Sequence, residues 1–185
     1  DAMHAFSTHV DVQLAELKQD VSGLKEDVSV LKQDVSVLKQ DVSVLKQDVL
    51  ALKQALKDGT IDVIASDHAP HAPEEKEVEF NLAPFGMIGM ESMLPLVITE
   101  LVDKKILTLS EAVAKMTVNP ARILGISKGT LAVGADADIT IIDLEKQWVI
   151  DPSKFKSKSR NCPFAGRKVK GKAVKIIVGG KVIAL

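Results

Sequence analysis

Residues 28–48 read VSVLKQDVSVLKQDVSVLKQD, which is one seven-residue unit repeated three times without a change. If the valine that opens each unit is heptad position a, the leucine three residues later is position d. Position a then holds Leu14, Val21, Val28, Val35, Val42, Val49 and Leu56, and position d holds Val10, Leu17, Leu24, Leu31, Leu38, Leu45 and Leu52. Seven successive heptads with apolar residues at both positions predict a coiled-coil helix over residues 10–58, after a short tail at residues 1–9.

The charges beside this apolar stripe favour parallel self-association. Lysine fills position e from Lys18 to Lys53, and aspartate fills position g from Asp20 to Asp48. In a parallel pair of helices each g residue meets the next e residue of the partner, whereas an antiparallel pair would bring like charges together. Valine at a with leucine at d favours two strands. Valines at position c widen the stripe, however, and leave a trimer or packing onto another surface open.

The composition of the whole chain excludes several classes of protein. The chain has 185 residues, of which 46% are hydrophobic and 26% charged, so it is neither a disordered tail nor a membrane protein. We expect no membrane-spanning segment and no signal peptide. Cys162 is the single cysteine, which excludes an internal disulfide and any multi-cysteine zinc site. The lack of a cysteine framework favours a cytoplasmic location.

The positive charge of the C-terminal end has a structural interpretation. Residues 151–185 hold 10 basic side chains and 1 acidic side chain, whereas the whole chain has a net charge of −1. A basic end can bind nucleic acid or a membrane surface. Here the lysines at 168, 170 and 172 alternate with other residues in a strand-like pattern. We therefore expect a solvated strand face and no nucleic-acid partner.

Beyond the heptads the pattern changes to short strands and helices. Gly59 is placed to end the long helix. The apolar run IDVIAS at 61–66 predicts a buried parallel strand, and so an α/β segment over residues 59–128. Helices are expected over residues 90–102, over residues 111–117 with Ser110 as cap, and from Asn119-Pro120 onward. Residues 129–185 are rich in turns and strand-like runs, which predicts a small antiparallel β layer.

Several motifs in this second half resemble one enzyme family. KDGTIDVIASDHAPHAPEEK at 57–76, APFGMIGMES at 83–92, NPARILGI at 119–126 and GTLAVGADADITIID at 129–143 are similar to the C-terminal part of a bacterial dihydroorotase. The resemblance continues through SKSRNCPFAGRKVKGKAVKIIVGGKVI at 157–183 and covers roughly 70% of the chain. Dihydroorotases belong to the amidohydrolase superfamily. The SDHAPH motif is the specific one, whereas G-x-L-x-x-G-x-x-A-D is shared more widely in the superfamily.

The resemblance implies a fold, a reaction and a set of site residues. Family members are zinc-dependent (β/α) barrels with a small composite β domain, and they interconvert dihydroorotate and N-carbamoyl-aspartate in pyrimidine biosynthesis. Asp67 matches the aspartate after the last barrel strand, which ligates metal and acts as general base. His71 matches a histidine that contacts the substrate carboxylate. The backbone at Phe85 and Gly86 matches a loop that hydrogen-bonds the substrate.

The residues themselves agree with these roles and also allow simpler ones. The active sites of such barrels lie at the C-terminal ends of the strands, where Asp67 falls. A carboxylate beside a metal-bound water can accept its proton, because the metal lowers the pKa of that water. An aspartate after an apolar run is also an ordinary turn or capping residue. We interpret His68 as structural.

The sequence departs from the family in its metal ligands. The paired histidines of the first strand, the carboxylated lysine of a middle strand and two later histidines have no counterpart, and His4 and His9 have the wrong spacing. A catalytic zinc normally has three protein ligands. One hypothesis is therefore a hydrolase fragment that is inactive alone and binds no stoichiometric zinc. The alternatives are a coiled-coil oligomerisation protein with a passenger hydrolase segment, or a site completed by a partner.

Overall fold

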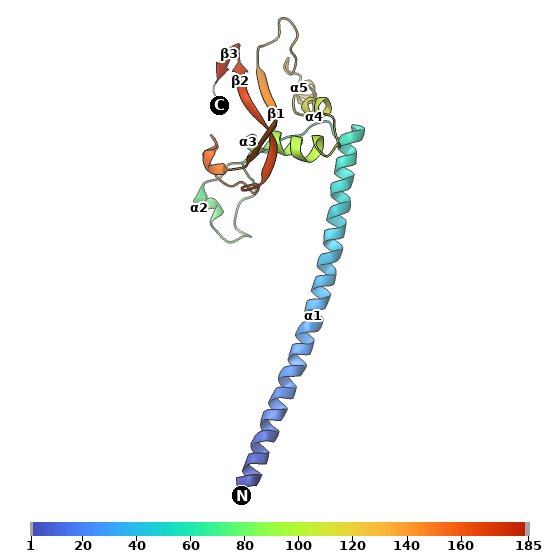
Figure 1. The fold of residues 1–185 in the computed structure, drawn as a ribbon, viewed down its shortest axis with the longest axis vertical. Helices are drawn as coiled ribbons and strands as arrows, with labels where there is room; N and C mark the ends of the chain where they lie inside the picture. The colour runs from blue at the N-terminus through green and yellow to red at the C-terminus, as the bar shows by residue number, and fades with distance from the viewer. Residues whose placement is uncertain (1, 184–185) are drawn as a thin grey trace. The chain divides into compact units, whose positions relative to one another are not determined.

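The computed structural model describes residues 2–183, with the side chains of residues 2–8 and 10 left undescribed. The chain divides into two compact units, Asp1–Leu52 and Lys53–Leu185. Figure 1 shows the helices and strands of each unit. No helix in the described part of the chain has both the length and the apolar character that crossing a bilayer requires.

The first unit is formed by helix α1, which spans Ala2–Asp58 and continues into the start of the second unit. It begins before Val10, so residues 2–9, which the sequence assigns to a tail, continue the helix. Residues 2–9 contain no proline or glycine, and nothing in that stretch opposes helix formation. The helix ends where the sequence predicts, before Gly59, whose φ of +87° is the left-handed conformation that glycine adopts most readily. Coiled-coil pairing of α1 stays a prediction.

The second unit combines short helices with one sheet. Its helices are α2 (Pro73–Lys76), α3 (Met90–Val97), the π-helical turn η1 (Ile98–Val102), α4 (Leu109–Met116), α5 (Val118–Leu124) and the 3₁₀ turn η2 (Pro152–Lys154). Its strands are β1 (Ile139–Val149), β2 (Lys168–Val178) and β3 (Lys181–Ile183). Helix α3 packs on β2, and α4 contacts both η1 and α5.

The sheet confirms the predicted small antiparallel layer. Its strand order is β1-β2-β3, and both pairings are antiparallel. Ile139 pairs with Ile177 at one end of the β1–β2 ladder, and Val149 pairs with Lys168 at the other. Gly179 and Gly180 both have positive φ, at +54° and +79°, which fits the tight turn between β2 and β3. The strand-like runs of the sequence thus merge into two long strands and one short one.

The predicted parallel strand at 61–66 is wrong. These residues form no strand, and their side chains are half-buried except for the exposed Asp62 and Ala65. Helices α4 and α5 hold it in place: the buried Lys115 ammonium donates to the carbonyl of Ile61, and the Asn119 amide donates to the carbonyl of Asp62 at 2.9 Å. A parallel strand needs neighbouring strands for its backbone groups. The strands described here are all antiparallel and pair with one another, so the run finds helices as partners and not a sheet.

Two of the short helices begin earlier than the sequence predicts. Thr108, and not Ser110, caps α4: the Thr108 hydroxyl accepts from the Glu111 N–H at 3.2 Å, and the Glu111 carboxylate accepts from the Thr108 N–H at 2.7 Å. This reciprocal pair satisfies two of the free N–H groups at the helix start. Helix α5 begins at Val118, one residue before the predicted cap Asn119.

Two apolar clusters hold the second unit together. One is formed by Ile88, Ile150, Cys162 and Val169, with Trp148 and Phe155 among the side chains packed against it. The other joins Val97 and Leu101 to Leu107 and Ala112 of the α4 region. Because Ile88 is fully buried, the loop that precedes α3 is anchored in the first cluster.

Candidate functional site

Asp67 lies on a loop that the start of α3 fixes on both sides. A side chain on Gly89 would place its Cβ 2.4 Å from the carbonyl oxygen of Ser66, so these two backbones approach as closely as only glycine permits. On the other side of Asp67, the Nδ1 atom of His68 accepts hydrogen bonds from the backbone N–H groups of Gly89 and Met90, at 3.1 and 3.4 Å. The loop is therefore positioned by α3 and not by a strand.

His68 has the structural role that the sequence suggests. The first N–H groups of a helix have no partner within the helix, and the His68 ring supplies one at the start of α3. The residue also forms an isolated parallel bridge with Met87, in which the Ala69 N–H donates to the Met87 carbonyl at 2.9 Å. Nδ1 is thus the accepting nitrogen, and Nε2 carries the proton.

Asp67 itself is exposed and has a left-handed backbone, with a φ of +43°. Aspartate is one of the few residues besides glycine that tolerate this conformation. Its carboxylate can accept a proton or bind a cation at the surface of the unit. The residue that the resemblance implies as a general base is therefore accessible at the surface.

The three residues that the resemblance implies as substrate contacts meet in one place. The Nε2 atom of His71 donates to the carbonyl oxygen of Phe85 at 2.9 Å. Gly86 follows directly, and a Cβ on it would lie 3.2 Å from the same nitrogen. The Phe85 side chain points away from this contact and is 96% exposed. Two loops that belong to separate sequence motifs therefore meet in one polar contact.

Glu75 holds the other side of the His71 ring. The Nδ1 atom of His71 lies 3.3 Å from the Glu75 carboxylate. That carboxylate also accepts from the Ala72 N–H at 2.9 Å. The hydrogen bond from Ala72 lowers the pKa of Glu75 most, and the one from His71 lowers it further. Both neighbours of the His71 ring are oxygen atoms, so the Glu75 side chain and the Phe85 backbone fix the ring from its two nitrogens.

Asn161 is a member of this loop cluster that the sequence does not single out. Its side-chain amide donates to the carbonyl of Gly86 at 2.9 Å, and its backbone carbonyl accepts from the Ile88 N–H at 3.1 Å. A residue 75 positions further along the chain thus fixes the loop that contacts His71. No local pattern marks such a contact, because it depends on how the segment after β1 folds back.

A second polar link holds the same segment to α3. The Glu91 carboxylate accepts from the backbone N–H of Ser157 at 2.8 Å and from its hydroxyl at 2.8 and 2.9 Å. Burial on its own raises the pKa of Glu91, but the hydrogen bonds from Ser157 outweigh it, and the net pKa lies below the ordinary value. The carboxylate therefore stays charged in this link near neutral pH.

The described residues do not fit a catalytic zinc. Such a site normally takes three protein ligands, and structural sites take four. Within residues 2–183 no group of three or more His, Cys, Asp or Glu side chains is placed to hold a metal ion. Asp67, which the resemblance implies as a metal ligand, has no such companions among the described residues.

The largely apolar cavity between α3 and the sheet is a separate feature. It has a volume of about 330 Å³, and its lining includes Leu94, Trp148, Phe155 and Lys172. Asp67, His71, Phe85 and Gly86 do not line it. The candidate site is therefore an open surface of loops and not this cavity.

Comparison with known proteins decides the family. The model of the amidohydrolase family matches residues 3–183. The chain belongs to the amidohydrolase family. The dihydroorotase of Pelotomaculum thermopropionicum is 61% identical over 130 residues, and that of Acetivibrio thermocellus is 57% identical over 130 residues. Each match covers 70% of this amidohydrolase chain and 30% of the relative, which fits a C-terminal part.

Solved structures agree with this placement. The L-hydantoinase (dihydropyrimidinase) of Arthrobacter aurescens matches 73% of this chain with a TM-score of 0.69 at 38% identity, and the match covers 31% of that enzyme. The dihydropyrimidinase of Brevibacillus agri matches 72% of this chain with the same TM-score at 29% identity, over 30% of that enzyme. This amidohydrolase chain thus spans about 30% of the length of the curated relatives that it matches.

Proposed function

We propose that residues 53–183 are the part of a dihydroorotase-type enzyme that supplies Asp67 and the substrate loop, and that the 185 residues alone do not hydrolyse a cyclic amide. The substrate class is a dihydropyrimidine ring amide such as dihydroorotate, as in the relatives named dihydroorotase. The observation that carries the proposal is the contact between His71 and the Phe85–Gly86 backbone. It joins the residues that the resemblance implies as substrate contacts.

The roles of the side chains follow from their positions. Asp67 is the proton acceptor, because its carboxylate is exposed at the surface that the substrate would approach. His71 contacts the substrate carboxylate, as the resemblance implies, and holds the Phe85 carbonyl in place. Asn161 keeps the Gly86 backbone in position from the opposite side. These residues bind and orient a substrate, but they do not create a nucleophile.

The missing nucleophile is the reason why we expect no turnover from the chain alone. Hydrolysis of an amide near neutral pH needs an activated water, and the family activates it with a metal held by ligands from several strands. The described residues contribute one such ligand, Asp67, to a site that needs three or more. Dihydroorotate and N-carbamoyl-aspartate should both stay unchanged in its presence.

A chimera with a complete relative tests the positive half of the proposal. Residues 53–185 would replace the matching segment of the Pelotomaculum thermopropionicum enzyme, with which the chain shares 61% identity. We expect this chimera to hydrolyse dihydroorotate, and Asp67→Asn in it to abolish the activity. Asp62→Asn is the matched control, because Asp62 is an exposed aspartate five residues earlier. An inactive but folded chimera, or equal activity of both variants, would overturn the proposed roles.

A further inference from the structure

We propose that helix α1 is a docking surface for a second copy of this chain, in a parallel, in-register, two-stranded coiled coil over residues 10–57. This inference concerns helix α1 and is independent of the proposed hydrolase function. It rests on three features of α1: an exposed apolar face, hollows that recur at the same heptad positions, and charges that complement themselves in one orientation.

The apolar a and d side chains of α1 are exposed from Leu14 to Leu52. Val21 is 45% exposed, Leu24 62% and Val28 46%, and the values repeat in the following heptads. A single helix with such a stripe is poorly stable in water, because most helical stability in proteins comes from packing an apolar face. Burying these valines and leucines against another helix removes that apolar area from water. We therefore expect the stripe to pack against a partner helix of matching length and heptad spacing.

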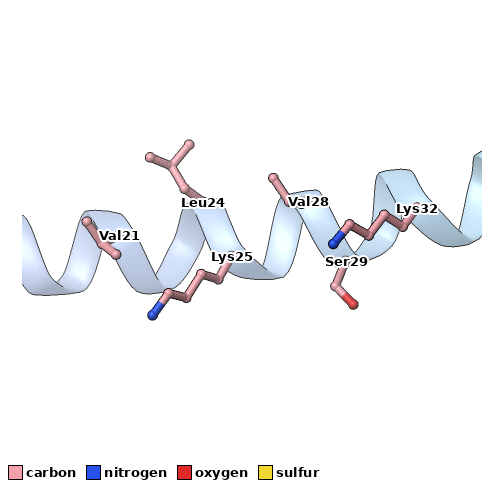
Figure 2. A pocket seen from close by; sticks show the side chains of 6 residues that line it. All are labelled: Val21, Leu24, Lys25, Val28, Ser29 and Lys32. Atoms are coloured by element: carbon pink, nitrogen blue, oxygen red, sulfur yellow. The ribbon is translucent and has the colours of Figure 1, made fainter.

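Hollows on this face have the arrangement that receives a partner side chain. Figure 2 shows one of them, with Leu24 and Val28 on one side of the helix and Ser29 on the other. Its lining is Val21, Leu24, Lys25, Val28, Ser29 and Lys32. The first four are positions a, d, e and a of successive heptads, which frame a hole for one side chain of a facing helix. The hollow at Val35, Leu38, Lys39, Val42, Ser43 and Lys46 has the same positions two heptads later.

The charges select a second copy of the same chain. In a parallel pair each g aspartate meets the e lysine of the next heptad on the partner, as Asp27 meets Lys32. Five such g–e pairs follow from Asp20–Lys25 to Asp48–Lys53. The ion pairs of the described residues involve none of these side chains, so their charges are free for a partner. A partner must then offer lysine at e and aspartate at g, as this chain does.

The same charges decide the direction of the pair, and the apolar area that it buries decides the register. An antiparallel pair sets aspartate against aspartate and lysine against lysine, which is unfavourable. A shift by one heptad keeps the contacts of the three identical units but leaves one heptad at each end unpaired. The in-register pair therefore buries the largest apolar area. Valine at a with leucine at d favours two strands.

The mass of the full chain in solution tests the assembly. Sedimentation equilibrium at micromolar concentration should give twice the 19.9 kDa of one chain. Changing three g residues together, as Asp27→Asn, Asp34→Asn and Asp41→Asn, should weaken association by roughly tenfold or more, because six interchain pairs are lost. The matched control changes Gln33, Gln40 and Gln47 to lysine at position f, which alters the net charge equally. A monomer, a trimer, or equal effects of the two variants would overturn the proposal.

A cysteine experiment tests the direction. In a Cys162→Ser background, oxidised Leu17→Cys chains should form a disulfide with themselves, because position d side chains of the same number meet in a parallel pair. Mixing them with Leu52→Cys chains should give no mixed disulfide. If the mixed disulfide forms and the self-disulfide does not, the helices are antiparallel and the proposal fails.

Discussion

The Nε2 atom of His71 lies 2.9 Å from the carbonyl oxygen of Phe85, and this hydrogen bond links the SDHAPH loop to the loop before α3. Gly86, the next residue, is packed so closely that an added Cβ would lie 2.6 Å from the Cβ of Ala69 and 3.2 Å from the His71 nitrogen. Its φ of +121° is also one that residues with a side chain rarely adopt.

Gly86→Ala should therefore disturb the contact between the two loops. We expect it to lower the free energy of unfolding by about 2 kcal/mol or more, since both strain and a clash are introduced. Gly166→Ala is the control, because Gly166 has a φ of +78° but nothing within 4 Å of an added Cβ. It should cost about 1 kcal/mol. Urea unfolding of the full chain measures both, and equal losses would contradict the close packing at Gly86.

Glu91 should make the stability of the second unit depend on pH. Its pKa in the folded chain is lowered by the Ser157 hydrogen bonds, so it stabilises the fold above its ordinary pKa, and this contribution is lost as the pH falls through the folded value. Glu91→Gln should remove that acid-side dependence and lower stability at pH 7. Thermal melts between pH 3 and pH 7 measure it, with the exposed Glu74→Gln as control. If the thermal stability of Glu91→Gln falls with pH as steeply as that of the unchanged chain, the assignment is contradicted.

The start of α4 separates two candidate caps. Thr108→Ala removes the hydroxyl that accepts from Glu111 N–H and should cost about 1 kcal/mol. Ser110 lies inside the helix and is exposed, so Ser110→Ala should change the free energy of unfolding by less than about 0.5 kcal/mol. Chemical denaturation of the two variants gives the comparison, and the reverse order would place the cap at Ser110 after all.

Backbone amide exchange should show that residues 61–66 are not part of a sheet. In the described structure the N–H groups of Ile61 and Ile64 donate to the backbone carbonyls of Ala55 and Lys115, at 2.9 and 3.0 Å. The amides of Asp62, Val63 and Ala65 should exchange quickly with solvent, and the amides in the β1–β2 ladder slowly. Hydrogen–deuterium exchange of the full chain resolves the two groups. Slow exchange throughout 61–66 would indicate that the segment is paired as a strand.

The C-terminal β layer was predictable from the sequence because its information is local. Strand-like runs separated by turn residues pair with their sequence neighbours, and the Gly179-Gly180 turn brings β2 and β3 together. The run IDVIAS has the same apolar character, but a parallel strand depends on other strands that are distant in sequence. Its pattern alone predicted a strand, and its actual neighbours, Lys115 and Asn119, make it an extended loop.

The candidate site likewise has residues that the sequence predicts and residues that only the fold reveals. Asp67 and His71 stand out because a short motif contains both, and Phe85 and Gly86 because a second motif contains them. Asn161 contributes to the same cluster through a contact with Gly86 across 75 positions, and Glu91 through its link to Ser157. Such contacts follow from tertiary folding, so a reading of motifs along the chain does not find them.

The proposal that one metal ligand remains without its companions is tested most directly by the zinc content of the purified full chain. Elemental analysis after dialysis, together with an assay of dihydroorotate hydrolysis, measures it. We predict well below one zinc ion per chain, the same content in Asp67→Ala, and no turnover. One or more zinc ions per chain that are lost in Asp67→Ala, together with measurable hydrolysis, would contradict the account and show that the chain builds a complete site.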